Sequence, residues 1–327
     1  MSEKIKRIAV FTSGGDAPGM NAALRAVVRY ATAKDLHVYG IYRGYEGMID
    51  GDIKRLETRD VGNIIHRGGT VLRTARSDRF RTKEGRQMAY ESLTALDIDA
   101  CVAIGGDGTF TGAKVFTEEF DIPMIGVPGT IDNDLYGTDY TIGFDTAVNT
   151  AIEAVDKIRD TADSHNRLFF IEVMGRNSGF IALNTGIGSG ASNILIPERD
   201  TDIDGLVKIL KKSAKRKKLF SLAIVAEGNK MGGATAIAEM VKKKYDFYDI
   251  KVAIIGHLQR GGSPTAADRV LASRLGCSAV QALLDGKKNS MVGVINNKVA
   301  YTPFKKAIKL KKDPREDLIR MAEILGI

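Results

Sequence analysis

The chain has 327 residues, of which 44% are hydrophobic, and its formal net charge is +8. A chain of this length exceeds the size at which one hydrophobic core usually stops growing, so we expect two domains. No run approaches the 18 apolar residues of a membrane helix, and the apolar run after residue 7 is too short for a secretory signal. The two cysteines, Cys101 and Cys277, lie far apart, which favours free thiols over a disulfide framework or a zinc site. Together these features predict a cytoplasmic protein that does not associate with a membrane.

Segments with strand and helix character alternate along nearly the whole chain. Short apolar runs predict strands over residues 8–11, 38–41, 101–104, 124–127, 168–173, 193–196, 219–225 and 252–255. Helical spacing of apolar residues predicts helices over 21–33, 146–163 and 264–284. Repeated strand–helix units predict an α/β fold, with largely parallel sheets flanked by helices and ligands at the carboxyl ends of the strands. The polar stretch 136–145 is a plausible crossing point between two lobes.

Three of the predicted strands run directly into turns that are rich in glycine and aspartate, at residues 12–19, 105–109 and 128–134. Glycine lets the backbone approach a ligand closely, and the exposed N–H groups of such turns bind anions. Carboxylates belong in such a cradle when Mg²⁺ is present, since Mg²⁺ binds through one or two carboxylates plus the phosphates of a substrate. The third turn also places the carboxylates of Asp132 and Asp134 beside a hydroxyl, which suits catalysis. The pattern predicts a Mg²⁺–nucleotide site.

Loops in the second half add cations and polar groups. Residues 174–176 read Met-Gly-Arg, Glu227 follows a strand, and residues 256–264 combine His257 and Arg260 with glycines. Arginine in a glycine-flanked loop suits bidentate binding of phosphate. A glutamate at a strand end is suited to accept hydrogen bonds from sugar hydroxyls. These loops predict a lobe that binds a phosphorylated polyol.

The basic run 211–218 could be interpreted as a nucleic-acid patch. We interpret it instead as the solvated end of a helix whose dipole favours cations there. No aromatic residues interleave with the run, as base-stacking platforms would. No nucleic-acid partner is therefore predicted. The four histidines show no metal-ligand spacing.

Several long strings in this order resemble bacterial ATP-dependent phosphofructokinases over essentially the full length. They are residues 12–19, 67–70, 75–76, 105–109, 129–134, 174–176 and 256–264. The resemblance implies transfer of the γ-phosphoryl group of ATP to the 1-hydroxyl of fructose 6-phosphate, with Mg²⁺, in a homotetramer. It also implies an ATP lobe of residues 1–143 plus 258–311 and a sugar-phosphate lobe of residues 144–257 plus 312–327.

The resemblance further implies roles for individual residues. Asp132 would be the base, with Thr130, Arg76 and Arg176 as its catalytic partners, and Asp107 would serve Mg²⁺. ATP would bind at Gly15, Ala75, Arg76, Gly106, Asp107, Gly108 and Thr109. Fructose 6-phosphate would bind at Thr130, Ile131, Asp132, Asp134, Met174, Gly175, Arg176, Glu227, His257 and Arg260, with Arg167 and Lys251 reaching in from a neighbouring subunit. An effector site would use Arg25, Arg29 and Arg159.

The chain also departs from the family pattern. Lys251 stands where the family usually has arginine, so a bidentate phosphate contact becomes a point charge. In the effector site, the usual glutamate is Ser192, and Leu219-Phe220 replaces a Lys-His pair. We therefore expect weak allosteric control.

Three alternatives stay open on sequence alone. Pyrophosphate-dependent relatives usually carry aspartate at the position of Gly108 and lysine at that of Gly129, and glycine at both positions favours ATP. Diacylglycerol and NAD kinases share the Gly-Gly-Asp-Gly-Thr loop but lack the 130–134 string. A catalytically inactive nucleotide-binding regulator is disfavoured because Asp107, Asp132, Arg76 and Arg176 are all present.

Overall fold

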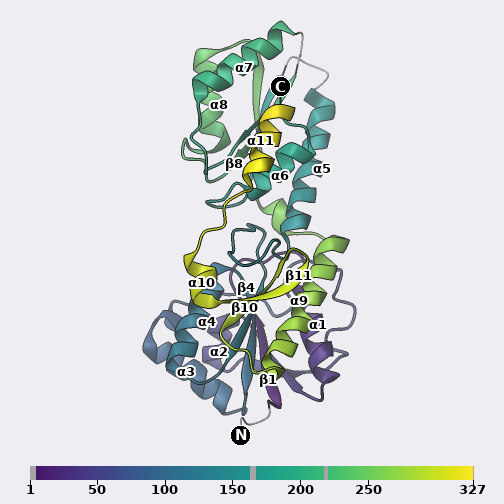
Figure 1. The fold of residues 1–327 in the computed structure, drawn as a ribbon, viewed down its shortest axis with the longest axis vertical. Helices are drawn as coiled ribbons and strands as arrows, with labels where there is room; N and C mark the ends of the chain where they lie inside the picture. The colour runs from purple at the N-terminus through teal and green to yellow at the C-terminus, as the bar shows by residue number, and fades with distance from the viewer. Residues whose placement is uncertain (1–4, 163–166, 217–219, 327) are drawn as a thin grey trace. The chain divides into compact units, whose positions relative to one another are not determined.

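The computed structural model describes residues 5–162, 167–216 and 220–326 (Figure 1). The chain divides into two compact units. Unit 1 comprises Met1–Ile131, Leu135–Asp145 and Arg260–Lys311, and unit 2 comprises Asp132–Asp134, Thr146–Gln259 and Lys312–Ile327. Each unit is therefore built from segments that are far apart in the sequence.

Unit 1 contains a seven-stranded sheet with the order β11-β10-β5-β4-β1-β2-β3. Its strands are β1 (Arg7–Thr12), β2 (His37–Ile41), β3 (Ile53–Leu56), β4 (Ala100–Gly105), β5 (Met124–Pro128), β10 (Ser290–Ile295) and β11 (Lys298–Pro303). The five central strands are parallel, whereas β3 and β11 are antiparallel to their neighbours. In the register, Thr12 lies opposite Ile104 and Gly105 lies opposite Pro128. The carboxyl ends of β1, β4 and β5 thus meet at one edge of the sheet.

Helices cover the sheet of unit 1: α1 (Met20–Thr32), α2 (Gly44–Asp50), α3 (Lys83–Thr94), α4 (Asp107–Glu119), α9 (Ala266–Leu284) and α10 (Phe304–Lys309). Helix α1 follows Gly19, whose φ of 108° lies in the left-handed region that glycine adopts without strain. The late helix α9 packs against α1, and β10 pairs with β5, so the end of the chain completes the first sheet. Phe11, Phe110 and Phe116 are fully buried in the core of this unit.

Unit 2 contains a parallel four-stranded sheet with the order β7-β8-β6-β9. Its strands are β6 (Arg167–Val173), β7 (Asn193–Leu195), β8 (Ser221–Ala226) and β9 (Asp249–Ile254). Its helices are α5 (Phe144–Ala162), which begins at the end of a unit 1 segment, α6 (Phe180–Gly188), α7 (Ile203–Lys215), α8 (Gly233–Lys244) and α11 (Glu316–Leu325). A core that includes Leu168, Phe170, Leu210 and Ile237 lies between this sheet and helices α7 and α8.

The predicted α/β class is confirmed, and most predicted elements are present with ends that differ by a few residues. The helix predicted over 146–163 begins at Phe144. The strand predicted over 219–225 is β8, which begins at Ser221, and residue 219 lies outside the described part of the chain. Strands β3, β10 and β11 were not among the predicted elements.

Candidate active site

The loop after β1 is stabilised by contacts with two distant segments of unit 1. The backbone N–H of Ser13 donates to the carbonyl of Ile104 over 3.0 Å, and Gly14 has a φ of 85°. A Cβ atom at Gly15 would lie only 2.7 Å from Nη1 of Arg260, and this Nη1 donates to the carbonyl of Asp16 over 3.1 Å. A side chain at position 15 would displace this guanidinium, so glycine lets Arg260 lie directly against the loop.

The segment that carries Ala75 and Arg76 is tied to the ends of β1 and α1. The buried side chain of Asn21 donates to the carbonyl of Arg67 over 3.0 Å and accepts from the N–H of Val71 over 2.8 Å. The hydroxyl of Thr12 bonds to that of Thr70 over 2.8 Å. The backbone is thereby fixed while the Arg76 side chain remains exposed. Sequence reasoning did not single out Asn21, although it directly follows the glycine loop.

The second glycine turn leads into α4, whose first residue is Asp107. Asp107 and Gly108 are exposed, whereas Thr109 is buried and its carbonyl accepts a 2.6 Å hydrogen bond from the hydroxyl of Tyr45. Burial raises the pKa of Tyr45 well above its usual value, so this hydroxyl stays protonated and remains a donor. The N–H groups in the first turn of a helix have no intrahelical partner and attract anions. The turn therefore presents an anion site, and the hydrogen bond from Tyr45 to the carbonyl of Thr109 fixes its position.

The three glycine turns converge within unit 1. A Cβ atom at Gly14 would lie 3.4 Å from Oγ1 of Thr109, and one at Gly106 would lie 3.5 Å from Cβ of Thr130. A Cβ atom at Gly108 would meet nothing within 4 Å, whereas one at Gly129 would lie 3.0 Å from the Met20 side chain and 3.2 Å from Ile104. The cradle is open beside Gly108 and closed beside Gly129.

The turn that carries Asp132 belongs to unit 2. Asp132 is 3% exposed, and its Oδ2 lies 3.5 Å from Nε of Arg176. Its carbonyl accepts a 3.1 Å hydrogen bond from the hydroxyl of Ser178. The next residue, Asn133, has a φ of 54° and accepts a 3.1 Å hydrogen bond from Nζ of Lys312. Arg176 thus holds the side chain of Asp132, and Ser178 holds its backbone.

Buried or partly buried polar side chains hold the turn at residues 174–179. Oε1 of Glu227 accepts from the N–H groups of Gly175 and Arg176 over 3.1 and 2.7 Å. Oε1 of Gln259, which is fully buried, accepts from the N–H of Met174 over 2.8 Å. Glu198 accepts from the N–H of Gly179 over 2.8 Å. The structure therefore gives Glu227 a backbone role that its strand-end position did not indicate.

Arg167, at the start of β6, and Lys251, on the neighbouring edge strand β9, lie close together in the unit 2 sheet. Asp249 lies between them, with Oδ2 3.4 Å from Nε of Arg167 and Oδ1 3.0 Å from Nζ of Lys251. The hydrogen bond from Lys251 and the nearby guanidinium lower the pKa of Asp249. The edge strand β9 also exposes Val252 and Ile254, with 39% and 61% of their surface accessible, and His257 follows it as an exposed residue.

The predicted site residues fall into the two units as follows. Unit 1 holds Gly15, Ala75, Arg76, Gly106, Asp107, Gly108, Thr109, Thr130, Ile131 and Arg260, together with Arg25 and Arg29 on α1. Unit 2 holds Asp132, Asp134, Arg167, Met174, Gly175, Arg176, Glu227, Lys251, His257 and Arg159. The side chain of Arg159, on α5, donates to the carbonyl of Ser189.

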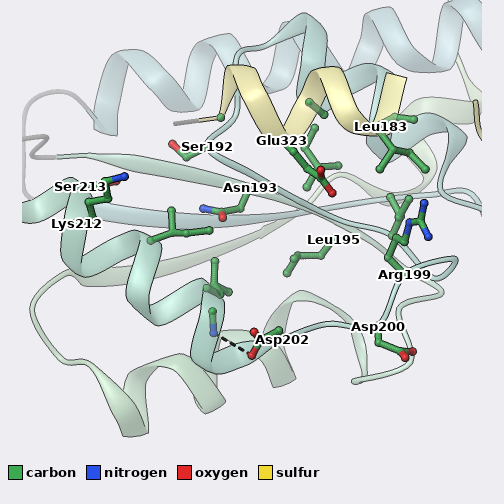
Figure 2. Close-up of a pocket in the computed structure, with 18 of the residues that line it drawn as sticks. Leu183, Ser192, Asn193, Leu195, Arg199, Asp200, Asp202, Lys212, Ser213 and Glu323 are labelled. Carbon is green, nitrogen blue, oxygen red and sulfur yellow. Dashed lines mark hydrogen bonds between the residues drawn. The ribbon is translucent and has the colours of Figure 1, made fainter. Parts of the chain in front are cut away.

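A separate pocket of about 410 Å³ lies in unit 2 between β7, α7 and α11 (Figure 2). Ser192 lines it, but none of the predicted catalytic, ATP-binding or sugar-binding residues does. In the described parts of the chain, no group of three or more His, Cys, Asp or Glu side chains is arranged to hold a metal ion. No described helix is long and apolar enough to cross a membrane.

Comparisons with known proteins agree along the whole chain. A family model described as Phosphofructokinase matches residues 7–283. The chain is 56% identical over 323 residues to ATP-dependent 6-phosphofructokinase 1 of Thermus thermophilus, which covers 99% of this chain and 100% of that protein. It is 55% identical over 323 residues to ATP-dependent 6-phosphofructokinase 2 of Bacteroides thetaiotaomicron, which covers 99% of each. A solved structure of phosphofructokinase from Saccharomyces cerevisiae is similar with a TM-score of 0.89 at 38% identity, covering 93% of this chain but 45% of that longer one.

Proposed function

Since this chain belongs to the phosphofructokinase family, we propose that it transfers the γ-phosphoryl group of ATP to the 1-hydroxyl of fructose 6-phosphate in glycolysis. The geometric observation that carries this proposal is the convergence of three glycine turns on the N-terminus of α4. Such a cradle suits the phosphates of a nucleotide, because backbone N–H groups and the helix dipole face the anion. We place the reaction in the cytoplasm.

Unit 1 is the proposed ATP lobe. The phosphate cradle is formed by Gly15, Gly106, Gly108 and Thr109. Ala75 and the exposed Arg76 approach it on a neighbouring segment. Hydrogen bonds from the side chains of Asn21 and Thr12 anchor that segment. Arg76 supplies a cation for the phosphates, since its planar guanidinium suits two phosphate oxygens at once.

Asp107 is the proposed Mg²⁺ ligand. Its carboxylate is exposed at the start of α4, directly beside the anion site, and the described residues form no larger cluster of metal ligands. This donor set fits Mg²⁺, which usually takes one or two carboxylates and completes its shell with water and substrate phosphates. When bound, the ion neutralises the charge on the phosphates that it contacts.

Unit 2 is the proposed sugar-phosphate lobe, and it also carries the base. Asp132 accepts the proton of the 1-hydroxyl as that oxygen attacks, and Thr130 orients the acceptor. Arg176 and Arg76 are proposed to supply positive charge to the transferring group. The sugar phosphate binds through Ile131, Asp134, Met174, Gly175, Arg176, Glu227, His257 and Arg260.

Arg167 and Lys251 are proposed to act on the 6-phosphate of a neighbouring subunit in a homotetramer. Lys251 lies on the edge strand β9 with the exposed Val252 and Ile254, and Arg167 lies on the neighbouring strand β6, as a surface that contacts another copy of the chain requires. Arg25, Arg29 and Arg159 are proposed to form the effector site.

The open cradle at Gly108 supports ATP as the donor. A side chain there would occupy space that is open in this chain, whereas a side chain at Gly129 would be in tight contact with Met20 and Ile104. Pyrophosphate-dependent transfer and an inactive regulator are therefore not favoured.

A coupled assay of fructose 1,6-bisphosphate formation, which reports turnover with either phosphoryl donor, tests the proposal. We expect fructose 6-phosphate and ATP with Mg²⁺ to give rapid turnover, and pyrophosphate in place of ATP to give none. Turnover with pyrophosphate alone, or no turnover of fructose 6-phosphate with either donor, would contradict it.

A further inference from the structure

The pocket between β7, α7 and α11 has the size and composition of a ligand site. Its volume of about 410 Å³ lies within the range of small-molecule pockets, roughly 300–1,000 Å³. Ile194 on β7, Leu206 and Ile209 on α7, and Ile319 on α11 supply an apolar interior. Helix α11 contributes the small residue Ala322 at this surface, which leaves room rather than filling it.

The charged groups of the pocket differ between its two ends (Figure 2). At one end, Arg199 pairs with Glu316, Asp200 lies 3.1 Å from Lys230, and Asp202 caps α7 through the N–H of Gly205. At the other end lie Lys212 and Ser213, and Lys212 has no ion-pair partner among the described residues. An uncompensated cation beside an apolar interior favours a ligand with an anionic head and an apolar body.

Two further groups define the ligand. The amide of Asn193 points towards the end where Lys212 and Ser213 lie (Figure 2), and its buried nitrogen has no hydrogen-bond partner among the described residues. An acceptor oxygen at this end would supply the missing partner after a small rotation of the amide. The carboxylate of Glu323 on α11 also lines the pocket and disfavours a ligand that is anionic along its whole length.

We propose that this pocket binds a small monocarboxylate with an apolar chain, whose carboxylate lies at Lys212 and Ser213 and whose chain lies against Ile194, Leu206 and Ile319. The pocket borders the proposed effector site, since Ser192 lines it, but Arg159 does not line it and Arg25 and Arg29 belong to unit 1. It is distinct from the proposed active site, so ligand binding is measurable without turnover.

Octanoate is a suitable probe, with octanol as the uncharged control of equal chain length. In the full chain labelled at isoleucine methyl groups, octanoate should shift the signals of Ile194, Ile209 and Ile319 in a saturable manner. We expect a dissociation constant on the order of 1 mM, which lies within the ligand-efficiency bound for a ligand of this size. Octanol should bind at least threefold more weakly, since it lacks the charge that Lys212 recognises.

Three variants separate the contributions. Ala322→Phe should weaken octanoate binding at least tenfold, because the ring occupies the space of the alkyl chain. Lys212→Met, an exposed change that leaves the core intact, should weaken octanoate about three- to fivefold and leave octanol unchanged. Arg159→Ala should leave octanoate binding unchanged.

The opposite results would overturn the proposal. Absence of saturable shifts at the three isoleucines, equal affinity for octanol and octanoate, or loss of binding in Arg159→Ala would each do so. If Ala322→Phe does not fold, the Lys212→Met variant and the octanol comparison still decide the outcome.

Discussion

Asp132 combines features that a general base needs. It is 3% exposed, Arg176 lies 3.5 Å from its carboxylate, and Ser178 holds its carbonyl. A base must lie within hydrogen-bonding reach of the proton it accepts, so a fixed backbone matters as much as the acid itself. Ser178 donates to that backbone carbonyl, and Lys312 donates to the side chain of the next residue, Asn133.

Replacing Asp132 with serine should leave the fold and substrate affinities nearly unchanged and lower kcat sharply. Loss of a general base typically costs about 10²–10⁴ in rate. Steady-state kinetics, with circular dichroism as the control for folding, measure this directly. A variant that keeps a tenth of wild-type turnover would show that Asp132 is not the base.

Lys251 offers a second test at a single residue. Lys251→Arg should lower KM for fructose 6-phosphate and leave KM for ATP unchanged, because a guanidinium binds two phosphate oxygens where an ammonium acts as a point charge. Lys242→Arg, on the exposed surface of α8, is the matched control. If KM for fructose 6-phosphate and KM for ATP change equally, or if neither changes, Lys251 does not contact the 6-phosphate.

Among the structural elements, the turn at residues 174–179 depends on side chains that approach it from elsewhere in unit 2. Gln259 accepts from the N–H of Met174 and donates to the carbonyl of Ala147 over 3.3 Å. It therefore links the end of β6 to α5 and to the short helical segment 256–260. Gln259 is not itself assigned to substrate contact, but it holds the backbone of Met174, which is, so we propose that Gln259 is a positioning residue.

Gln259→Leu should raise KM for fructose 6-phosphate and lower kcat while KM for ATP stays constant. The buried N–H of Met174 and carbonyl of Ala147 would lose their partner, which should also lower the free energy of unfolding by about 1–3 kcal/mol. Gln87→Leu, at an exposed position on α3, is the control. A purely structural role for Gln259 predicts lower stability with both KM values and kcat unchanged.

The sequence predicted many of the strands and helices, which depend on local patterns, but not the side-chain contacts between residues far apart in the chain. Strands β1, β4 and β5 and helices α1, α5 and α9 follow from apolar spacing and from the glycines that end or precede them. The contacts of Ser178 with Asp132 and of Gln259 with Met174 join residues 46 and 85 positions apart, and no local pattern encodes them. The structure likewise brings Lys211 to 5.4 Å from the ring of Tyr245, so the basic run has an aromatic neighbour that its own sequence lacks.

For the whole molecule, the residues that we propose for allosteric control are distributed over both units. Arg25 and Arg29 lie on α1 in unit 1, whereas Arg159 lies on α5 in unit 2 and donates to the carbonyl of Ser189. An effector shifts an equilibrium only as far as its affinities for the two states differ. Ser192 removes a carboxylate that could hold the Mg²⁺ of bound ADP. Leu219-Phe220 stands where the family usually has a Lys-His pair, so polar groups are replaced by apolar ones. Residue 219 lies outside the described residues.

We expect ADP and phosphoenolpyruvate to change the activity of this enzyme only weakly. Saturation curves for fructose 6-phosphate should stay near-hyperbolic and shift little with millimolar effector. Ser192→Glu is the matched gain-of-function variant and should increase the response to ADP. A strong sigmoidal shift caused by phosphoenolpyruvate in the unmodified enzyme would contradict the expectation.

The late arrival of α9 and β10 in unit 1 has a consequence for synthesis on the ribosome. Until residues 266–295 have emerged, the nascent chain presents α1 without α9 and β5 without β10, the neighbour on its outer side. An open strand edge beside uncovered apolar side chains is the kind of surface that aggregates or recruits chaperones. Most of unit 2, residues 146–259, emerges before that, so unit 1 stays incomplete while most of the other unit has already been synthesised. Slowing translation after residue 145 should therefore lengthen the exposure of unit 1 and lower the yield of native enzyme.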